Sequence, residues 1–292
     1  MYHAVAECSP TANVAELMSD KLSAPFVRVK RYFLYLTRAK RIGNNAGVIR
    51  HCFTVAGSRQ RFSYRYKSVG DRGVVGKVFG ECEYAAKNYW PQTHALQKYY
   101  QAILARGKRP LIFDAGANIG ASCVYFSALY PRSEVVAIEP EKNNCALLRL
   151  NSEGRSIRVI EGAIGDEPGK LFLNDPGLSD WGFRVATTGA YEVTVHTPGA
   201  ILAEYPEQEF VPFIFKVDIE GAEELLFRSN LQWMDRFALI VLELHDWMLP
   251  GSYTSRPFLK AIASRNFDFM HHGENLFCFN YDLLGQPRDF RD

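Results

Sequence analysis

Residues 111–120, LIFDAGANIG, join a short apolar run to an acidic residue and a loop that contains two glycines. An unbroken apolar run such as Leu111 to Phe113 is typical of a strand buried on both faces, as in a parallel sheet. Gly116 and Gly120 allow a tight bend and a close approach of a ligand to the backbone. Because open α/β sheets bind ligands at the carboxyl ends of their strands, the stretch predicts a buried strand that ends in a ligand-binding loop.

The loop departs from the two common phosphate-binding motifs. A dinucleotide fingerprint requires Gly-x-Gly-x-x-Gly, whereas Asn118 and Ala121 stand at its second and third glycine positions. No Gly-Lys-Ser/Thr follows, which argues against a P-loop for a triphosphate. The remaining prediction is an adenosine ligand with little or no phosphate.

Further apolar runs continue the pattern toward the carboxyl terminus. Strands are expected within residues 135–140, 157–163, 213–221 and 237–245, and helices within residues 121–131, 143–151 and 222–234. This alternation predicts a parallel sheet with crossover helices on its faces. The segment at residues 267–280, FDFMHHGENLFCFN, predicts an antiparallel hairpin that turns at Gly273.

Charge divides the chain into two parts. Residues 1–110 contain 19 Lys and Arg and 6 Asp and Glu, whereas residues 111–292 contain 15 and 26. We therefore expect a basic N-terminal extension over residues 1–107 and a second domain over residues 108–292. Within the extension we predict helices at residues 25–41 and 94–107 and a β-hairpin around residues 48–69.

Two sequence features indicate the compartment. The chain lacks an apolar run of roughly 18 to 20 residues, and its first residues lack the basic start and apolar core of a signal peptide. The six cysteines are scattered, without a CxxC pair or zinc-finger spacing. These features predict a cytoplasmic protein with no transmembrane segment.

The ends of the second and third expected strands suit a nucleoside. Glu139 is placed to accept hydrogen bonds from ribose hydroxyls, although a solvated carboxylate at a strand end is the alternative. Ala163 and Ile164 offer an apolar wall and a backbone amide to an adenine ring. The predicted cofactor-binding residues are Asp114, Ala115, Gly116, Ala117, Asn118, Gly120, Glu139, Pro140, Ala163 and Ile164.

Five segments together resemble the FkbM-like family of class I S-adenosylmethionine-dependent methyltransferases. They are FDAGANIGASC, AIEPEKNNCALLRLN, EGAIGDE, FKVDIEGAEELLF and VLELHD. The resemblance implies a Rossmann-like α/β sandwich with a mostly parallel seven-stranded sheet and a C-terminal antiparallel hairpin, to which the N-terminal α+β extension is added. It further implies S-adenosyl-L-methionine as cofactor and O-methylation of a hydroxyl on a carbohydrate or polyketide-like small molecule.

The fourth and fifth expected strands carry charged residues toward this site. Their period of two places Lys216, Asp218 and Glu220 on one side, and burying such charges unpaired would cost several kcal/mol. We expect Lys216 to pair with Glu243, and Asp218 to orient His245 as a general base near neutral pH. Lys216, Asp218, Glu220 and His245 are the predicted catalytic residues. An ion-paired network without proton transfer is the alternative.

Four further residues are assigned to the acceptor. Trp181 and Arg184 lie between the third and fourth expected strands, where Trp181 could stack on a sugar or fold into the core. Glu223 could contact the ligand or stabilise the start of a helix, and Glu243 lies in the fifth expected strand.

No metal site is predicted, although a divalent metal is possible. Asp218, Glu220 and His245 offer suitable oxygen and nitrogen ligands. The metal is not favoured because the ammonium group of Lys216 already supplies positive charge.

The basic residues 30–41, KRYFLYLTRAKR, mix cations with aromatic rings as nucleic-acid surfaces do. A nucleic-acid-binding or nucleic-acid-modifying protein of methyltransferase fold is therefore the alternative function. The apolar face could instead pack on the acidic half of the chain or mediate homo-oligomerisation. The tetrapeptide typical of many base-modifying enzymes is absent from the fourth strand, where KVDIEG stands, and this argues against nucleic acid as a substrate.

Overall fold

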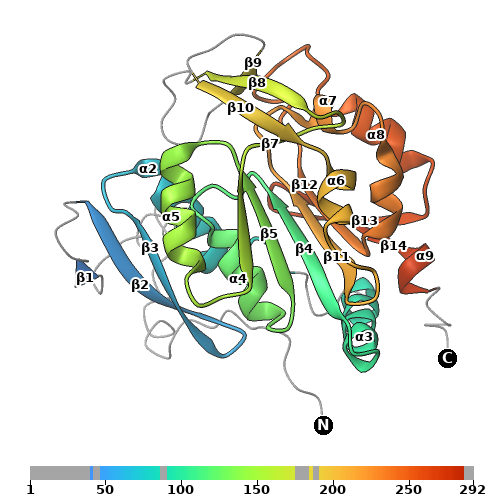
Figure 1. The fold of residues 1–292 in the computed structure, drawn as a ribbon, viewed down its shortest axis with the longest axis horizontal. Coiled ribbons are helices and arrows are strands. Elements are labelled where there is room, and N and C mark those ends of the chain that lie inside the picture. The colour runs from blue at the N-terminus through green and yellow to red at the C-terminus, as the bar shows by residue number, and fades with distance from the viewer. Residues whose placement is uncertain (1–39, 42–46, 86–90, 175–183, 187–190, 286–292) are drawn as a thin grey trace, which may run out of the picture.

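The centre of the molecule is a seven-stranded sheet in the order β13-β14-β12-β11-β4-β5-β6 (Figure 1). The computed structural model describes residues 40–41, 47–85, 91–174, 184–186 and 191–285. The parallel strands are β4 (Arg109–Ala115), β5 (Glu134–Glu139), β6 (Ile157–Glu161), β11 (Phe210–Val217) and β12 (Leu239–Glu243). The hairpin of β13 (Phe267–His272) and β14 (Asn275–Asn280) pairs antiparallel with β12. The predicted sheet and its C-terminal hairpin are confirmed.

Hydrophobic cores cover both faces of this sheet. Ile112 of β4 belongs to one core, whereas Leu111 and Phe113 belong to the other, because successive residues of a strand point to opposite faces. The first core contains residues of α3 (Pro91–Ala105), α4 (Ala121–Leu129) and α5 (Lys142–Ser152). The second contains residues of α6 (Pro198–Ala203), α7 (Glu223–Leu226) and α8 (Arg256–Ala263), which lie across the sheet from α4 and α5 in Figure 1. A short final helix, α9 (Tyr281–Leu284), follows β14.

The N-terminal part adds a small antiparallel sheet of β1 (Lys40–Arg41), β2 (Val48–Val55) and β3 (Ser58–Arg65). Its hairpin and helix α3 confirm two of the three elements expected in the extension. Phe62 and Tyr64 of β3 are buried in the same core as helix α4. Asn151 of α5 accepts a hydrogen bond from the backbone amide of Ser63 and donates one to its carbonyl, at 2.8 and 2.9 Å. The hairpin is thus joined to the sheet by packing and hydrogen bonds.

The expected helix at residues 25–41 lies almost entirely outside the described residues, so its proposed packing stays a prediction. The domain boundary between residues 107 and 108 also stays a prediction. Within the described part of the chain, every helix is too short or too polar to cross a membrane.

The helix expected at residues 222–234 forms only in part. Helix α7 covers four residues, and a 3-10 turn, η3 (Leu231–Arg236), follows it. Asn230 interrupts the helix in a left-handed conformation with φ of 55°. Its side-chain amide donates a hydrogen bond to the carbonyl of Asp166 at 3.0 Å, and such local hydrogen bonding competes with the helical pattern.

The segment of the chain between β6 and α6 forms a second sheet. It contains β7 (Ala163–Ile164), β8 (Gly169–Asn174), β9 (Arg184–Ala186) and β10 (Tyr191–His196) in the order β7-β10-β8-β9. Ala163 is expected in the third strand, but that strand ends at Glu161 and the chain turns at Gly162. A Cβ on Gly162 would lie 2.7 Å from the carbonyl oxygen of Thr194, so this crossing requires glycine.

Candidate active site

A cavity of about 600 Å³ lies at the carboxyl ends of β4, β5, β11 and β12. Its walls include the loop after β4, the end of β5 and the loop after β11. Residues of the N-terminal part also line it. They belong to α2 (Val69–Val75), to the π-helical turn η2 (Gly76–Gly80) and to the segment that follows η2. The position agrees with the general rule for ligand sites in open α/β sheets.

The loop after β4 is held between its two neighbouring strands. The amides of Gly116 and Ala117 donate to the carbonyl of Ile138 on β5, at 3.0 and 3.1 Å. Gly116 has φ of 73°, and a Cβ on it would lie 1.6 Å from the carbonyl oxygen of Asp218. Only glycine meets both conditions. The loop therefore brings the end of β5 and the segment after β11 to one place.

Asp114 and Lys216 form a buried ion pair beneath this loop. They are direct partners in the register of β4 and β11, and Lys216 Nζ lies 3.1 Å from Asp114 Oδ1. Lys216 also donates a hydrogen bond to the Gly116 carbonyl at 2.8 Å. The predicted pairing of Lys216 with Glu243 is therefore wrong. The reason is register, because Lys216 lies beside Val241, two residues before Glu243, on the other neighbouring strand.

Glu139 places a buried carboxylate at the end of β5. Its oxygens accept hydrogen bonds from the amides of Asn118 at 2.8 Å and Glu141 at 3.0 Å. Burial raises the pKa of Glu139 to about 7, although these hydrogen bonds favour the charged form. A carboxylate oxygen can accept two hydrogen bonds, so Glu139 retains capacity for a ligand at the cavity wall.

The predicted cofactor residues divide into two groups. Gly116, Ala117, Asn118, Glu139, Pro140, Ala163 and Ile164 line the cavity. Asp114, Ala115 and Gly120 are not among the lining residues. Asp114 accepts hydrogen bonds from Ser122 Oγ at 2.5 Å and Cys123 Sγ at 3.0 Å, which directs it into the protein interior. Gly120 begins α4 in a left-handed conformation.

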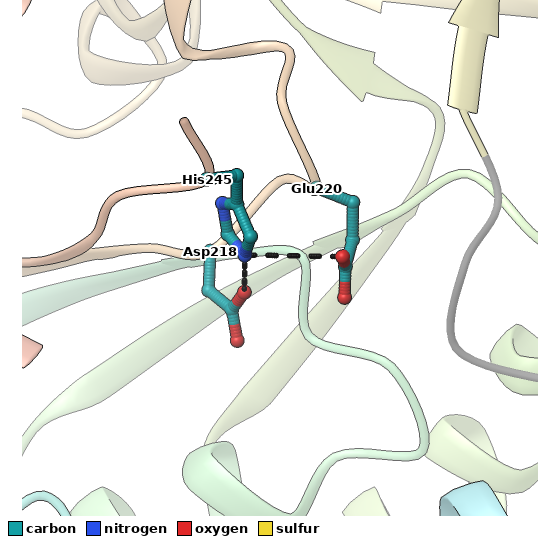
Figure 2. Close-up of side chains that lie close together, drawn as sticks. All are labelled: Asp218, Glu220 and His245. Carbon is teal, nitrogen blue, oxygen red and sulfur yellow. Dashed lines mark ion pairs between the residues drawn. The ribbon is translucent and has the colours of Figure 1, made fainter. Parts of the chain in front are cut away.

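The opposite wall of the cavity contains His245 and several carboxylates. Figure 2 shows the Nε2 atom of His245 facing Asp218 and Glu220. Nε2 lies 3.5 Å from Asp218 Oδ1, 3.8 Å from Glu220 Oε2 and 3.5 Å from Glu243 Oε1. Beneath it, His245 Nδ1 forms a 2.8 Å hydrogen bond with Glu223 Oε1. The four predicted catalytic residues, Lys216, Asp218, Glu220 and His245, all line the cavity.

Two expectations about this wall require correction. Strand β11 ends at Val217, and Glu220 has φ of 54°, so Asp218 and Glu220 extend from a loop rather than from an alternating strand. The closest carboxylate partner of His245 is Glu223, whereas Asp218 lies at 3.5 Å. Glu223 is fully buried, so its role is to hold the imidazole ring rather than to reach the cavity.

The charges on this wall shift the pKa values of its members. Burial opposes the charge of His245, but Glu223, Asp218 and Glu220 outweigh it and raise its pKa to about 9. Burial, reinforced by the charge of Asp218, raises the pKa of Glu220 to about 7 and that of Glu243 to about 8. His245 is therefore protonated at neutral pH, contrary to the expectation of a free base near pH 7. These groups titrate as a unit.

The remaining predicted acceptor residues are placed differently. Glu243 lines the cavity. Trp181 lies outside the described residues, and Arg184 is the first residue of β9, where only its backbone is described.

Sequence reasoning missed lining residues in the N-terminal part and after β12. Lys77 forms an ion pair with Glu274 of the C-terminal hairpin. Glu83 accepts a 2.7 Å hydrogen bond from Asn275. Trp247 also lines the cavity and is 70% exposed. Its position two residues after His245 was the available signal, whereas Lys77 and Glu83 carry none in the sequence.

Comparisons with known proteins identify what the chain is similar to. Residues 114–269, more than half of the chain, match the family model described as Methyltransferase FkbM domain. Methyltransferase 1 of Beauveria bassiana (strain ARSEF 2860) is 28% identical over 162 residues, which cover 46% of this chain and 64% of that protein. The chain thus spans less than two thirds of the length of this relative.

Two solved structures are also similar. Methyltransferase FkbM from Methylobacillus flagellatus KT has 15% identity and a TM-score of 0.39, covering 64% of this chain and 59% of that one. An O-methyltransferase from Bacillus cereus in complex with SAH has 11% identity and a TM-score of 0.35, covering 70% and 89%.

Proposed function

The chain belongs to the FkbM family of methyltransferases, and from this premise we propose that it methylates a small-molecule hydroxyl with S-adenosylmethionine as donor. The acceptor class that we propose is a carbohydrate or a polyketide-like compound. The observation that carries the proposal is the cavity itself, because the glycine loop and Glu139 share it with Asp218, Glu220 and His245. Cofactor and acceptor groups can therefore meet in one cavity.

The first wall suits an adenosine. The Glu139 carboxylate retains acceptor capacity for ribose hydroxyls, and the loop amides limit its movement. Ile138, Ala163 and Ile164 supply apolar surface for the adenine ring. We expect the sulfonium to point from this wall toward Asp218, because Gly116 of the loop lies directly against the Asp218 carbonyl.

Methyl transfer is an in-line displacement. The acceptor oxygen forms a bond to the methyl carbon while the carbon–sulfur bond breaks, and the bonding electrons neutralise the sulfonium. Alignment of the three atoms supplies much of the acceleration. The hydroxyl proton passes to the Asp218–His245 pair, in which His245 acts as base in its neutral form. Lys216 positions the loop through Asp114 and the Gly116 carbonyl.

Titration calorimetry with S-adenosylhomocysteine tests the cofactor assignment. We expect Glu139→Gln to weaken binding by about 10-fold or more, because it removes one charged acceptor from the ribose. Glu134→Gln, at the other end of β5, is the matched control and should bind like the wild type, because Glu134 pairs with Arg109. No binding by the folded wild-type protein would refute the assignment.

The acceptor is then sought by incubating the protein with labelled S-adenosylmethionine and panels of sugars and polyketides. Transfer of label to an oxygen supports the proposed chemistry, whereas transfer only to nitrogen or carbon contradicts it. The cytoplasmic location and self-association through the basic N-terminal part stay predictions.

A further inference from the structure

We propose that His245, Asp218 and Glu220, with Glu243 beside them, bind a divalent metal ion of the Mn²⁺ class at the cavity wall. The site is independent of cofactor binding, but its catalytic role rests on the proposed function. One nitrogen and two carboxylate oxygens of the first three residues lie within 4.8 Å of one another.

The arrangement around His245 Nε2 is the first argument. Three carboxylate oxygens surround this atom at 3.5, 3.5 and 3.8 Å. Every one of these distances exceeds the roughly 2.7–3.2 Å of an N–H···O hydrogen bond. A metal with ligands at about 2.0–2.2 Å instead keeps neighbouring ligand atoms about 3 to 3.5 Å apart. These ion pairs are longer than direct hydrogen bonds, and the donor atoms of His245, Asp218 and Glu220 lie within 4.8 Å of one another, so that one ion bound between them would draw the three together (Figure 2).

The orientation of the imidazole ring is the second argument. His245 is 2% exposed, and its Nδ1 atom is engaged by the buried Glu223 at 2.8 Å. Histidines that bind metals characteristically donate a hydrogen bond from their other ring nitrogen to a carboxylate, which fixes the ring orientation and the tautomer. Here that contact leaves Nε2 directed at Asp218 and Glu220.

The charge balance is the third argument. Of the two lysines that line the cavity among the described residues, Lys216 is committed to the buried Asp114 at 3.1 Å, and Lys77 pairs with Glu274. Lys216 also reaches Asp218, at 3.5 Å, but through Oδ2 rather than through the Oδ1 atom that faces His245. Four carboxylates thus surround one imidazole, namely Asp218, Glu220, Glu223 and Glu243. Glu223 and Glu243 are buried, and the side chains of Asp218 and Glu220 are 24% and 28% exposed. A dication would offset the negative charge that these groups carry when they are ionised.

The donor set indicates the metal class and its use. Carboxylate oxygens with one imidazole suit Mn²⁺ or Zn²⁺, and suit Mg²⁺ less because of the nitrogen ligand. On metal binding His245 releases its Nε2 proton to solvent and becomes a ligand. A hydroxyl of the acceptor that reaches the same ion becomes more acidic, and with Nε2 of His245 occupied by the metal its proton passes to solvent as the methyl group arrives.

Manganese titration of the metal-stripped full-length protein tests the site without cofactor or acceptor. Free Mn²⁺ is followed by electron paramagnetic resonance and bound Mn²⁺ by calorimetry. We expect saturable binding of one ion per chain, with affinity lowered about 10–100-fold in Asp218→Asn and His245→Gln. Glu224→Gln is the matched control, because Glu224 is exposed on the same short helix as Glu223, and it should bind like the wild type.

Two results would overturn the proposal. One is an unchanged Mn²⁺ affinity in both ligand variants. The other is no saturable binding by the wild type up to about 10 mM Mn²⁺, a concentration above the dissociation constants of known protein sites for such cations. Circular dichroism confirms folding of each variant. If His245→Gln fails to fold, Glu220→Gln replaces it, since the Glu220 side chain is 28% exposed.

Parallel titration with S-adenosylhomocysteine separates this proposal from the proposed function. Binding of S-adenosylhomocysteine without Mn²⁺ binding leaves the function standing and removes the metal. In that case, Asp218→Asn should weaken binding of S-adenosylmethionine but not of S-adenosylhomocysteine. The positive sulfonium, rather than a metal, would then offset the carboxylates.

Discussion

The cavity has two walls that are built in opposite ways: the proposed cofactor wall, formed by the Gly116 loop and Glu139, and the cluster wall, formed by His245 with Asp218, Glu220 and Glu243. On the cofactor wall, Glu139 is tied to the amides of Asn118 and Glu141 by hydrogen bonds of 2.8 and 3.0 Å. On the cluster wall, His245 Nε2 meets Asp218 only at 3.5 Å. The cofactor wall is therefore preorganised by the chain itself, whereas the cluster wall gathers charges that a ligand has still to bring together.

The walls meet at one backbone contact. Gly116 of the cofactor wall lies against the carbonyl of Asp218, which begins the cluster wall. Lys216 reinforces the contact from below, through Asp114 and the Gly116 carbonyl. Variants can therefore be chosen to affect both walls together or each wall alone.

The largest effect is expected from Gly116→Ala, which affects both walls. The new Cβ would lie 1.6 Å from the Asp218 carbonyl oxygen at a φ of 73°, so the loop must move. We expect a loss of about 3 kcal/mol or more in the free energy of unfolding, with loss of S-adenosylhomocysteine binding. Urea unfolding and calorimetry measure the two quantities.

Gly199→Ala in helix α6 is the control for that substitution. A Cβ there meets nothing within 4 Å, so the change in stability should be less than about 1 kcal/mol. If Gly116→Ala behaved like this control, the contact between the walls would be unimportant.

Asp218→Asn should affect the cluster wall alone. We expect kcat to fall about 10²- to 10⁴-fold, because the residue acts on the acceptor hydroxyl, whether directly or through a metal. Affinity for S-adenosylhomocysteine should change by less than about threefold, because this ligand lacks the sulfonium charge. Turnover kinetics on an identified acceptor and calorimetry check the pair of results, and equal losses in both would show that the walls are not separable.

The pH dependence of cofactor binding should report the cofactor wall. Burial raises the pKa of Glu139 to about 7 in the free protein, and the ionised form is the better hydrogen-bond acceptor. Affinity for S-adenosylhomocysteine should therefore rise with pH through about 7, by about tenfold between pH 6 and pH 8. Calorimetry across this range measures the effect. Glu139→Gln has no carboxyl to ionise and should lose this dependence, and if it kept the same pH profile, Glu139 would not be its source.

The raised pKa of Glu139 also has a consequence for stability. The neutral carboxyl is favoured in the folded state, so this group contributes most stability at pH values below the ordinary glutamate pKa of 4.5. The contribution is lost as the pH rises through about 7.

The smallest effect is expected at the Lys77–Glu274 ion pair. Both residues line the cavity, but they lie far in the sequence from the residues that form the two walls. Their side chains are 35% and 56% exposed, so solvent screens the pair. A double-mutant cycle with Lys77→Met and Glu274→Gln should give a coupling free energy below about 1 kcal/mol. The exposed pair Lys170–Glu192 provides a reference cycle of the same kind. A clearly larger coupling free energy would show that this ion pair contributes to the stability of the cavity alongside the two walls.

Local patterns were sufficient to predict much of this molecule. The apolar runs indicated five parallel strands and the terminal hairpin, because burial on both faces leaves a periodic trace in the residues themselves. The glycine loop and Glu139 were identified in the same way, since backbone conformation and strand-end position depend on neighbours in the chain. The second sheet escaped prediction because its β7 strand has only two residues.

The partners of the charged residues could not be predicted, since they depend on strand register and on segments distant in the chain. Lys216 pairs with Asp114, 102 positions earlier, because β4 and β11 align these two residues. Lys77 reaches the cavity only because the N-terminal segment packs against the sheet domain.

The sequence by itself determined the strands, the glycine loop after the first parallel strand and the family, because these follow from short-range periodicity and from motifs. Only the tertiary structure decided which carboxylate holds His245 and which cation balances Asp114. Electrostatic partnership is a matter of distance in space, and folding brings together residues that the linear order separates.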